Sequence, residues 1–183
     1  VFQIKCLSVW IFFRKYFNFD LICDFHFEGR KCCSYPLIKS EGDKTINHLN
    51  YYDYGNLLDV YSLTSGILPI YKKPLLYIGQ SNIDIVDKLK LPKRFISIHL
   101  ESKSSNRKWE LNKWISLVRF INKKFSLPVV EVGSESQLFM NDKSNHWNLC
   151  GVLSILSSAE VIRRSIFFIG VDSGPAHIAN AVS

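Results

Sequence analysis

From about residue 93 onward, the chain alternates short apolar runs with longer amphipathic stretches. Residues 95–99, 128–133 and 166–171 are mainly apolar, which is typical of buried strands. In residues 111–125, apolar side chains instead recur at spacings of three and four, which places them on one face of a helix. These side chains are Leu111, Trp114, Val118, Ile121 and Phe125. The pattern therefore predicts strands and helices in alternation.

Further elements continue this alternation to the end of the chain. The sequence predicts a short helix at 134–142, a brief strand at 147–150, a helix at 153–163 and a terminal helix from Ser173. Strands that are apolar throughout need cover on both faces, which is typical of a parallel, doubly wound α/β domain. Ligands of such domains bind beyond the carboxyl ends of the strands. The corresponding loops follow His99, Gly133 and Val171.

The first third of the chain carries weaker patterns. Residues 1–19 are aromatic and apolar but contain charged residues, so they predict a helix of a folded domain rather than a membrane span. We expect a strand at 21–27, a helix at 51–65, and a connection near Pro69 and Pro74. The expected domains are 1–74, a partial N-terminal domain with its linker, and 75–183. Because the terminal helical run ends without a stop signal and the chain begins with valine, we expect further residues at both ends.

Composition and charge narrow the function classes. The chain is 47% hydrophobic and 21% charged, which is ordinary for a globular protein and excludes disorder. Its net charge of +7 favours phosphorylated ligands or an anionic membrane face, and no nucleic-acid recognition motif is present. The five cysteines show neither zinc-like spacing nor a disulfide framework, so they predict reduced thiols in the cytoplasm.

The most informative segment is residues 170–177, GVDSGPAH. A buried strand ends there, Ser173 is suited to cap the next helix, Gly174 permits close approach to the backbone, and Pro175 fits a first helical turn. A helix start offers free N–H groups and a positive dipole end, which suit a phosphate. His177 would lie one turn further. The competing interpretation is an ordinary capped turn with a surface histidine.

A second candidate is the polar loop 101–108, which follows the strand that ends at His99. It offers hydroxyl groups and the adjacent cations Arg107 and Lys108 to an anion. A plain surface loop is the competing interpretation. If this loop and the Asp172 turn share one edge of the sheet, both would face the same crevice.

Together these segments resemble glycosyltransferase family 9, which includes the lipopolysaccharide heptosyltransferases. Residues 169–179, IGVDSGPAHIA, are similar to the family's D-[ST]-G-x-x-H-x-A element. Arg107, Lys108 and Trp109, with Trp114 beyond, resemble its K-x-W-P-x-x-x-W stretch. Residues 19–24, FDLICD, resemble the Y-D-x-x-I-D strand of its first domain. The resemblance covers most of the chain from about residue 19.

The resemblance implies a GT-B architecture: a Rossmann-like parallel-sheet donor domain and part of a second Rossmann-like N-terminal domain. It implies a cytoplasmic enzyme that transfers heptose or a related sugar from a nucleotide-diphosphate sugar, expected to be an ADP-sugar, to a lipopolysaccharide or cell-envelope glycan. Peripheral contact with the anionic inner membrane is compatible with the positive charge. The expected donor-binding residues, carried over by position, are Ser102, Arg107, Lys108, Glu135, Asp172, Ser173, Gly174 and His177.

Departures from the family pattern bear on the mechanism. Arg107 stands where the family has lysine and can still pair with phosphate, and Glu110 replaces its proline. No D-x-D motif is present, so we expect no metal and no cofactor. The family's catalytic base is expected in a segment N-terminal to this chain, and the alternative function is a catalytically incomplete nucleotide-sugar-binding fragment. An NAD enzyme and a P-loop nucleotidase are disfavoured because neither glycine-rich motif occurs.

Overall fold

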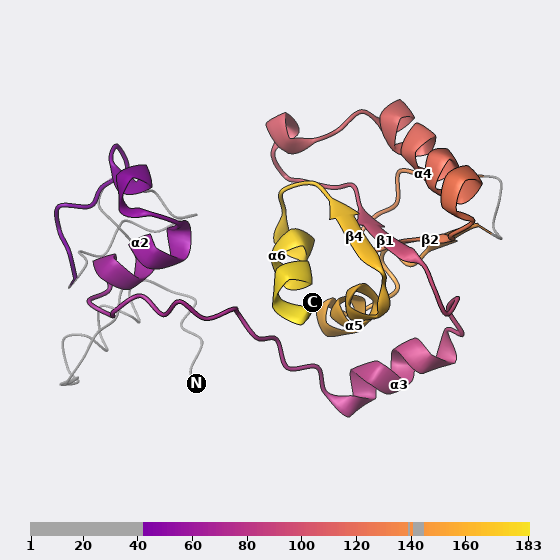
Figure 1. Ribbon diagram of the computed structural model, residues 1–183, viewed down its shortest axis with the longest axis horizontal. Coiled ribbons are helices and arrows are strands. Elements are labelled where there is room, and N and C mark those ends of the chain that lie inside the picture. The colour runs from indigo at the N-terminus through magenta and orange to yellow at the C-terminus, as the bar shows by residue number, and fades with distance from the viewer. Residues whose placement is uncertain (1–41, 139, 141–144) are drawn as a thin grey trace, which may run out of the picture. The chain divides into compact units, whose positions relative to one another are not determined.

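The computed structural model describes residues 42–138, 140 and 145–183, and the chain divides into two compact units, Val1–Lys72 and Lys73–Ser183 (Figure 1). The described part of the first unit contains η1 (Tyr51–Tyr54) and α2 (Leu57–Thr64). The prediction that residues 51–65 are helical is confirmed, but in two segments, because Gly55 adopts a φ of 100° and the Asn56 side chain caps a new helix start. The helix predicted at 1–19 and the strand at 21–27 lie outside the described residues.

The second unit is a parallel α/β domain. It contains α3 (Gln80–Lys88), β1 (Ile96–His99), η2 (Ser105–Arg107), α4 (Leu111–Phe125), β2 (Val129–Glu131), β3 (His146–Asn148), α5 (Ile155–Arg164), β4 (Phe167–Gly170) and α6 (Gly174–Val182). The four strands are parallel in the order β3-β2-β1-β4. The predicted α/β class is thus confirmed, with α4 on one side of the sheet and α5 and α6 on the other (Figure 1).

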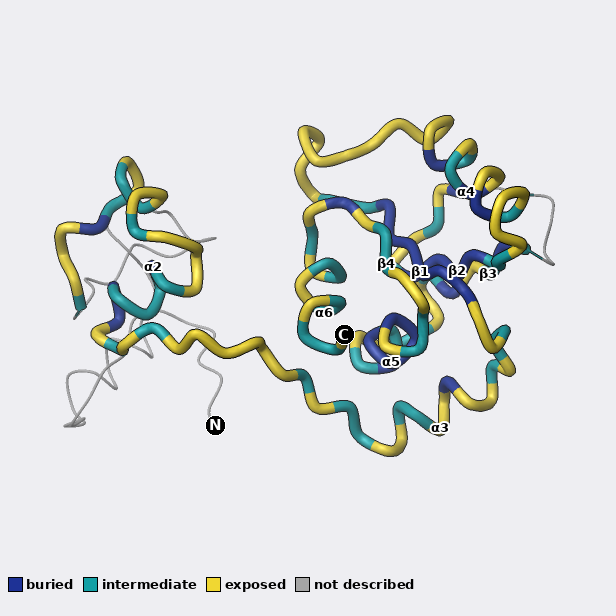
Figure 2. Tube along the Cα trace, viewed as in Figure 1, coloured by how far each residue is buried: buried dark blue, intermediate teal, exposed yellow. Residues whose placement is uncertain are grey.

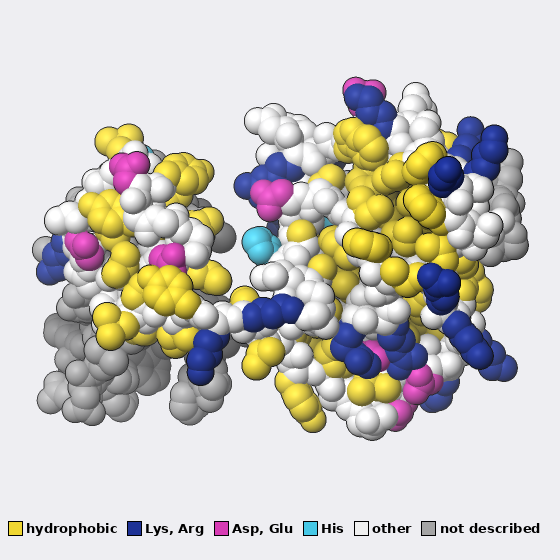
Figure 3. Space-filling model, viewed as in Figure 1, with side chains coloured by type: hydrophobic (Ala, Val, Ile, Leu, Met, Phe, Trp, Pro, Cys, Tyr) yellow, Lys and Arg dark blue, Asp and Glu magenta, His cyan; other side chains and the backbone are white. Residues whose placement is uncertain are grey.

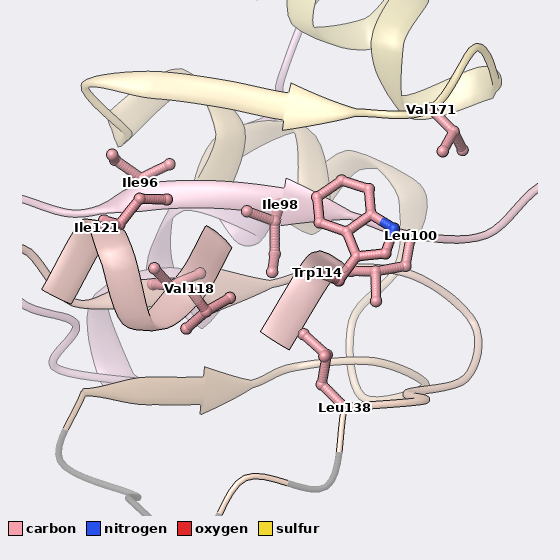
Figure 4. Packing of buried hydrophobic residues seen from close by; sticks show 9 residues of the cluster. Ile96, Ile98, Leu100, Trp114, Val118, Ile121, Leu138 and Val171 are labelled. Atoms are coloured by element: carbon pink, nitrogen blue, oxygen red, sulfur yellow. The ribbon is translucent and has the colours of Figure 1, made fainter. Parts of the chain in front are cut away.

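Alternating side chains of the strands build a hydrophobic cluster on each face of the sheet. On the α4 side, Trp114, Val118 and Ile121 pack with strand residues such as Ile98 (Figure 4). On the other side, Val130 packs with residues of α3 and α5 in a second cluster. Figure 2 shows that β1 and β2, at the centre of the sheet, are buried. The two clusters fix the sheet and thereby the positions of the loops at its carboxyl edge.

The ends of α4 differ from the prediction. Its three central apolar residues are buried as expected, but Leu111 is 39% exposed and Phe125 is 55% exposed. The reason is geometric, because a straight helix can touch the short strands only along its middle turns. Phe125 instead makes an edge contact with Phe120, with ring centroids 5.8 Å apart.

Two further predictions of secondary structure need correction. No helix forms in the described residues of 134–142, where Ser134 and Ser136 are held by side-chain hydrogen bonds to carboxylates. The strand expected at 147–150 is formed by His146–Asn148. Helix α3 was not predicted.

Strand β4 is less covered than its apolar sequence predicts. It lies at one end of the strand order, and Phe167 is 67% exposed. On the face drawn in Figure 3, hydrophobic side chains gather over α4 and β4. None of the helices in the described ranges is both long and apolar enough to cross a bilayer.

A charged network joins α3 to α5. The fully buried carboxylate of Glu160 accepts hydrogen bonds from Arg163 at 2.7 and 2.6 Å and from Arg164 at 2.7 Å. Arg164 also lies 2.7 Å from Asp87 of α3. Burial alone raises the pKa of the Glu160 carboxyl, but the hydrogen bonds from the two arginines outweigh it, so the pKa is lowered from 4.5.

Replacing Glu160 by glutamine is expected to lower the free energy of unfolding by about 1–3 kcal/mol at pH 7, because hydrogen bonds to a charged acceptor are lost. Since the pKa is lower in the folded chain, this stabilisation is complete above pH 4.5 and is lost as the pH falls through the folded-state pKa. Urea unfolding of both proteins between pH 3 and 7 measures the difference. A difference that stays constant over this range would contradict the assignment.

Candidate functional site

The order of the strands creates a crevice at the carboxyl edge of the sheet. The chain runs outward from β1 to β2 and β3, and then returns to place β4 on the opposite side of β1. The connections that leave β1 and β4 therefore diverge to opposite faces, which opens a gap between their first loops. Residue pairing aligns His99 with Gly170, so both strands end at the same level. This is the position at which ligands bind in doubly wound domains.

A pocket of about 670 Å³ occupies this edge, and we call it the carboxyl-edge pocket. It is lined by the loops that follow β1, β2 and β4. Of the eight predicted donor-binding residues, seven line it. Ser102, Arg107 and Lys108 come from the β1 loop, Glu135 from the β2 loop, and Asp172, Ser173 and Gly174 from the β4 loop. His177 is exposed on α6 and is not among the lining residues.

An ion pair joins the two loops on either side of the crevice. The guanidinium Nη1 of Arg107 lies 3.2 Å from Oδ2 of Asp172. Both side chains are more than half exposed, at 55% and 64%, so the pair contributes at most about 1 kcal/mol. An incoming anion can therefore displace Asp172 from Arg107 at small cost. The pair thus keeps the Arg107 guanidinium at the pocket and leaves it available to bind an anion.

Helix α6 begins at Gly174, directly after the short loop that follows β4. Ser173 occupies its N-cap position, but its hydroxyl donates to the Val171 carbonyl at 3.1 Å and does not cap the helix. The predicted side-chain cap is therefore wrong, because no N–H group of the first turn donates to this hydroxyl. Pro175 stands in the first turn as predicted and has no N–H. A Cβ added at Gly174 would meet no heavy atom within 4 Å, so the backbone there is open to a ligand.

Two carboxylates fix the loop that follows β2. Oε2 of Glu101, on the β1 loop, accepts from the Ser134 hydroxyl at 2.9 Å and from the Glu135 amide at 3.4 Å. Oε2 of the buried Glu131 accepts from the Ser136 hydroxyl at 2.8 Å. Hydrogen bonds to Glu101 and Glu131 thus hold the segment that carries Glu135 in place.

The Glu131 carboxylate also acts on the thiol of Cys150, which is not among the residues that line the pocket. It lies 3.2 Å from Nε2 of the buried His146. Burial, followed by the nearby charges of Glu131 and Glu101, raises the pKa of the Cys150 thiol well above its ordinary value. The thiol is therefore protonated at neutral pH and is a poor nucleophile.

Several residues of the pocket were not predicted as site residues. Glu101, Lys103, Ser104, Ser134 and Gln137 line it together with the buried His99. Only their position in the sequence could have pointed to them, because each lies within a few residues of the end of a predicted strand. Among the described residues, no group of three or more His, Cys, Asp or Glu side chains is arranged to hold a metal ion.

A parallel, doubly wound sheet with a pocket at its switch point, lined by both cations and carboxylates, defines the class of ligand-binding α/β domains. The family model for glycosyltransferase family 9 (heptosyltransferase) matches residues 73–183. The chain therefore belongs to glycosyltransferase family 9. A comparison with curated proteins finds no match.

Solved structures share the fold. An ADP-heptose lipopolysaccharide heptosyltransferase II from E. coli is 16% identical with a TM-score of 0.55, over 69% of this chain and 45% of that one. The E. coli heptosyltransferase TibC, dodecameric and iron-containing, in complex with ADP-D-beta-D-heptose is 18% identical with a TM-score of 0.52, over 78% and 37%. A family 9 glycosyltransferase from Veillonella parvula is 16% identical with a TM-score of 0.51, over 69% and 39%. The chain thus spans less than half the length of each, and the likeness establishes the GT-B-type fold.

Proposed function

We propose that residues 75–183 form the donor-binding domain of a glycosyltransferase and that the carboxyl-edge pocket binds the diphosphate of a nucleotide sugar. The observation that carries this proposal is the convergence of the Arg107 loop and the start of α6 on one pocket. Arg107 and Lys108 supply positive charge, and the Ser102 hydroxyl and the Gly174 backbone supply hydrogen bonds. Glu135 and Asp172 can accept hydrogen bonds from hydroxyl groups of the ligand.

In sugar transfer, negative charge builds up on the leaving diphosphate. Donors fixed in place before the reaction stabilise that charge without reorganisation, which is the largest contribution in many enzymes. The proposal assigns this role to the cations of the β1 loop and to the helix start at Ser173 and Gly174. His177, on the first turn of α6, is proposed to reach the donor when it is bound. The base that activates the acceptor is assigned to no residue of the described chain.

The donor is proposed to be an ADP-sugar, with heptose or a related sugar transferred to lipopolysaccharide or another cell-envelope glycan. Support comes from membership of the heptosyltransferase family and from the TibC structure, which contains ADP-D-beta-D-heptose. The net charge of +7 suits a cytoplasmic protein that touches the anionic inner membrane peripherally. The chain spans less than half of the matched structures, and donor binding is the part of the transfer reaction that we assign to the described residues.

Calorimetric titration with adenosine, AMP, ADP and UDP tests the proposal. Affinity is expected to rise by about tenfold or more from AMP to ADP, since each additional charged hydrogen bond contributes about 1.5–3 kcal/mol. ADP is expected to bind more tightly than UDP, and adenosine alone to bind weakly. Equal affinity for adenosine and ADP, or no binding of any nucleotide, would refute diphosphate binding at this pocket.

A further inference from the structure

The imidazole of His99 lies at the floor of the carboxyl-edge pocket. His99 is the last residue of β1, its exposed fraction is 6%, and it lines the pocket. Its Nδ1 lies 2.8 Å from the backbone carbonyl oxygen of Val132, the residue directly after the neighbouring strand β2. A carbonyl oxygen only accepts hydrogen bonds, so Nδ1 carries the hydrogen. This bond fixes both the orientation of the ring and the tautomer of its neutral form.

The backbone next to this bond leaves room for the ring. A Cβ added at Gly133 would lie 3.1 Å from Nδ1 and 3.3 Å from Cε1 of His99. It would also lie 3.5 Å from Sγ of Cys150. The imidazole is therefore seated closely between the ends of β1 and β2, with little freedom to turn.

The other ring nitrogen of His99, Nε2, is available to a ligand. Within the described part of the chain, Nε2 of His99 has no hydrogen-bond partner, and it is not among the side-chain atoms that are closed off from solvent. Since the residue is otherwise buried and lines the pocket, the open nitrogen faces the pocket space. An unpartnered polar group on a buried, immobilised ring is placed to contact a ligand.

Charged groups of both signs surround the ring. The titratable and charged groups of the surrounding elements are Glu101, Lys103, Arg107 and Lys108 on the β1 loop, Glu131 and Glu135 on β2 and its loop, His146 on β3, Cys150 after it, and Asp172 after β4. Because Nδ1–H is committed to Val132, the ring can donate to a phosphate oxygen only through a protonated Nε2. A bound diphosphate supplies the negative charge that stabilises the imidazolium.

We propose that His99 is a further donor-binding residue: when the diphosphate binds, Nε2 takes up a proton from solvent and donates a hydrogen bond to a phosphate oxygen. This inference rests on the proposed function, because it requires a diphosphate in the carboxyl-edge pocket. The proposed hydrogen bond from His99 would add a contact with the diphosphate to those proposed for Arg107 and for the start of α6.

The test is calorimetric titration of ADP into the wild-type protein, His99→Asn and His99→Gln, each in HEPES and in Tris. Asparagine can keep the donor to Val132 but has no group at the Nε2 position, whereas glutamine places an amide there. The ionisation enthalpies of the two buffers differ, so the two heats report the protons taken up on binding. Because ADP itself titrates, the readout is the difference between wild type and His99→Asn.

The expected result for His99→Asn is an unchanged unfolding temperature, about tenfold weaker binding of ADP, and loss of the proton uptake seen in the wild type. His99→Gln should regain part of the affinity without the proton uptake. If His99→Asn binds ADP with wild-type affinity and proton uptake, the inference is overturned while the proposed function stands. If the wild type binds neither ADP nor UDP, the proposed function fails and the inference with it.

Discussion

Replacing Arg107 by alanine is expected to weaken ADP binding by about tenfold to a hundredfold, because a charge-assisted hydrogen bond of about 1.5–3 kcal/mol is lost. The substitution also leaves Asp172, now without its partner at 3.2 Å, beside the incoming phosphates. Titration calorimetry of the variant measures the loss. Its stability is expected to stay close to that of the wild type, since the Arg107–Asp172 pair is exposed.

Two variants control for this result. Arg119→Ala removes the same group from the exposed surface of α4, outside the pocket, and should leave ADP binding unchanged. Arg107→Lys introduces the residue that the family pattern carries and should keep most of the affinity as a point charge. If Arg119→Ala weakened binding as much as Arg107→Ala did, the effect would reflect net charge and not a contact in the pocket.

The second large effect that we expect is a loss of stability when the hydrophobic cluster between α4 and the sheet is disrupted. Replacing Trp114, 3% exposed, by alanine is expected to lower the free energy of unfolding by about 3–5 kcal/mol, because a large cavity opens between α4 and the sheet (Figure 4). Trp114→Phe should cost much less, since its ring fills most of the space and the buried, unpartnered Nε1 is removed. Urea unfolding with comparison of midpoints and slopes measures both.

Phe125→Ala is the matched control, because it removes an aromatic ring from the same helix at a position that is 55% exposed. Its expected cost is below about 1 kcal/mol. If Trp114→Ala cost no more than Phe125→Ala, the packing of α4 against β1 would not be the source of stability.

Local pattern was sufficient to predict the elements that form the pocket. The spacing of Trp114, Val118 and Ile121 predicted α4, whose buried face they form. The three apolar runs predicted β1, β2 and β4, and the rule for parallel sheets pointed to the loops that follow them. These loops do line one pocket.

What local pattern could not give was the order of the strands. β4 lies beside β1 and not beside β3, and only long-range packing decides this. The order brings Arg107 to Asp172, and the pairing of β1 with β2 brings Glu101 to Ser134 and His99 to Val132. Side-chain bonds of this kind, which join residues at or beyond the ends of strands, leave no periodic signal in the sequence.

The helix that was missed and the helix that was wrongly predicted have different reasons. Helix α3 begins at Gln80 after Gly79, which offers no side-chain cap, and it buries only Val86, so neither its start nor its apolar face is evident in the sequence. The segment after Gly133 was predicted to be helical, but its serines are bound by Glu101 and Glu131. The bond from Ser134 joins this segment to the loop after β1, a contact that the local pattern of 134–142 does not contain.

The most direct test of the proposed donor site is a crystal structure of the protein with ADP bound. The account predicts the diphosphate between the guanidinium of Arg107 and the backbone amide of Gly174, within about 3 Å of each. Density for ADP at another surface, with Arg107 still paired to Asp172 and the start of α6 free of any ligand, would contradict it.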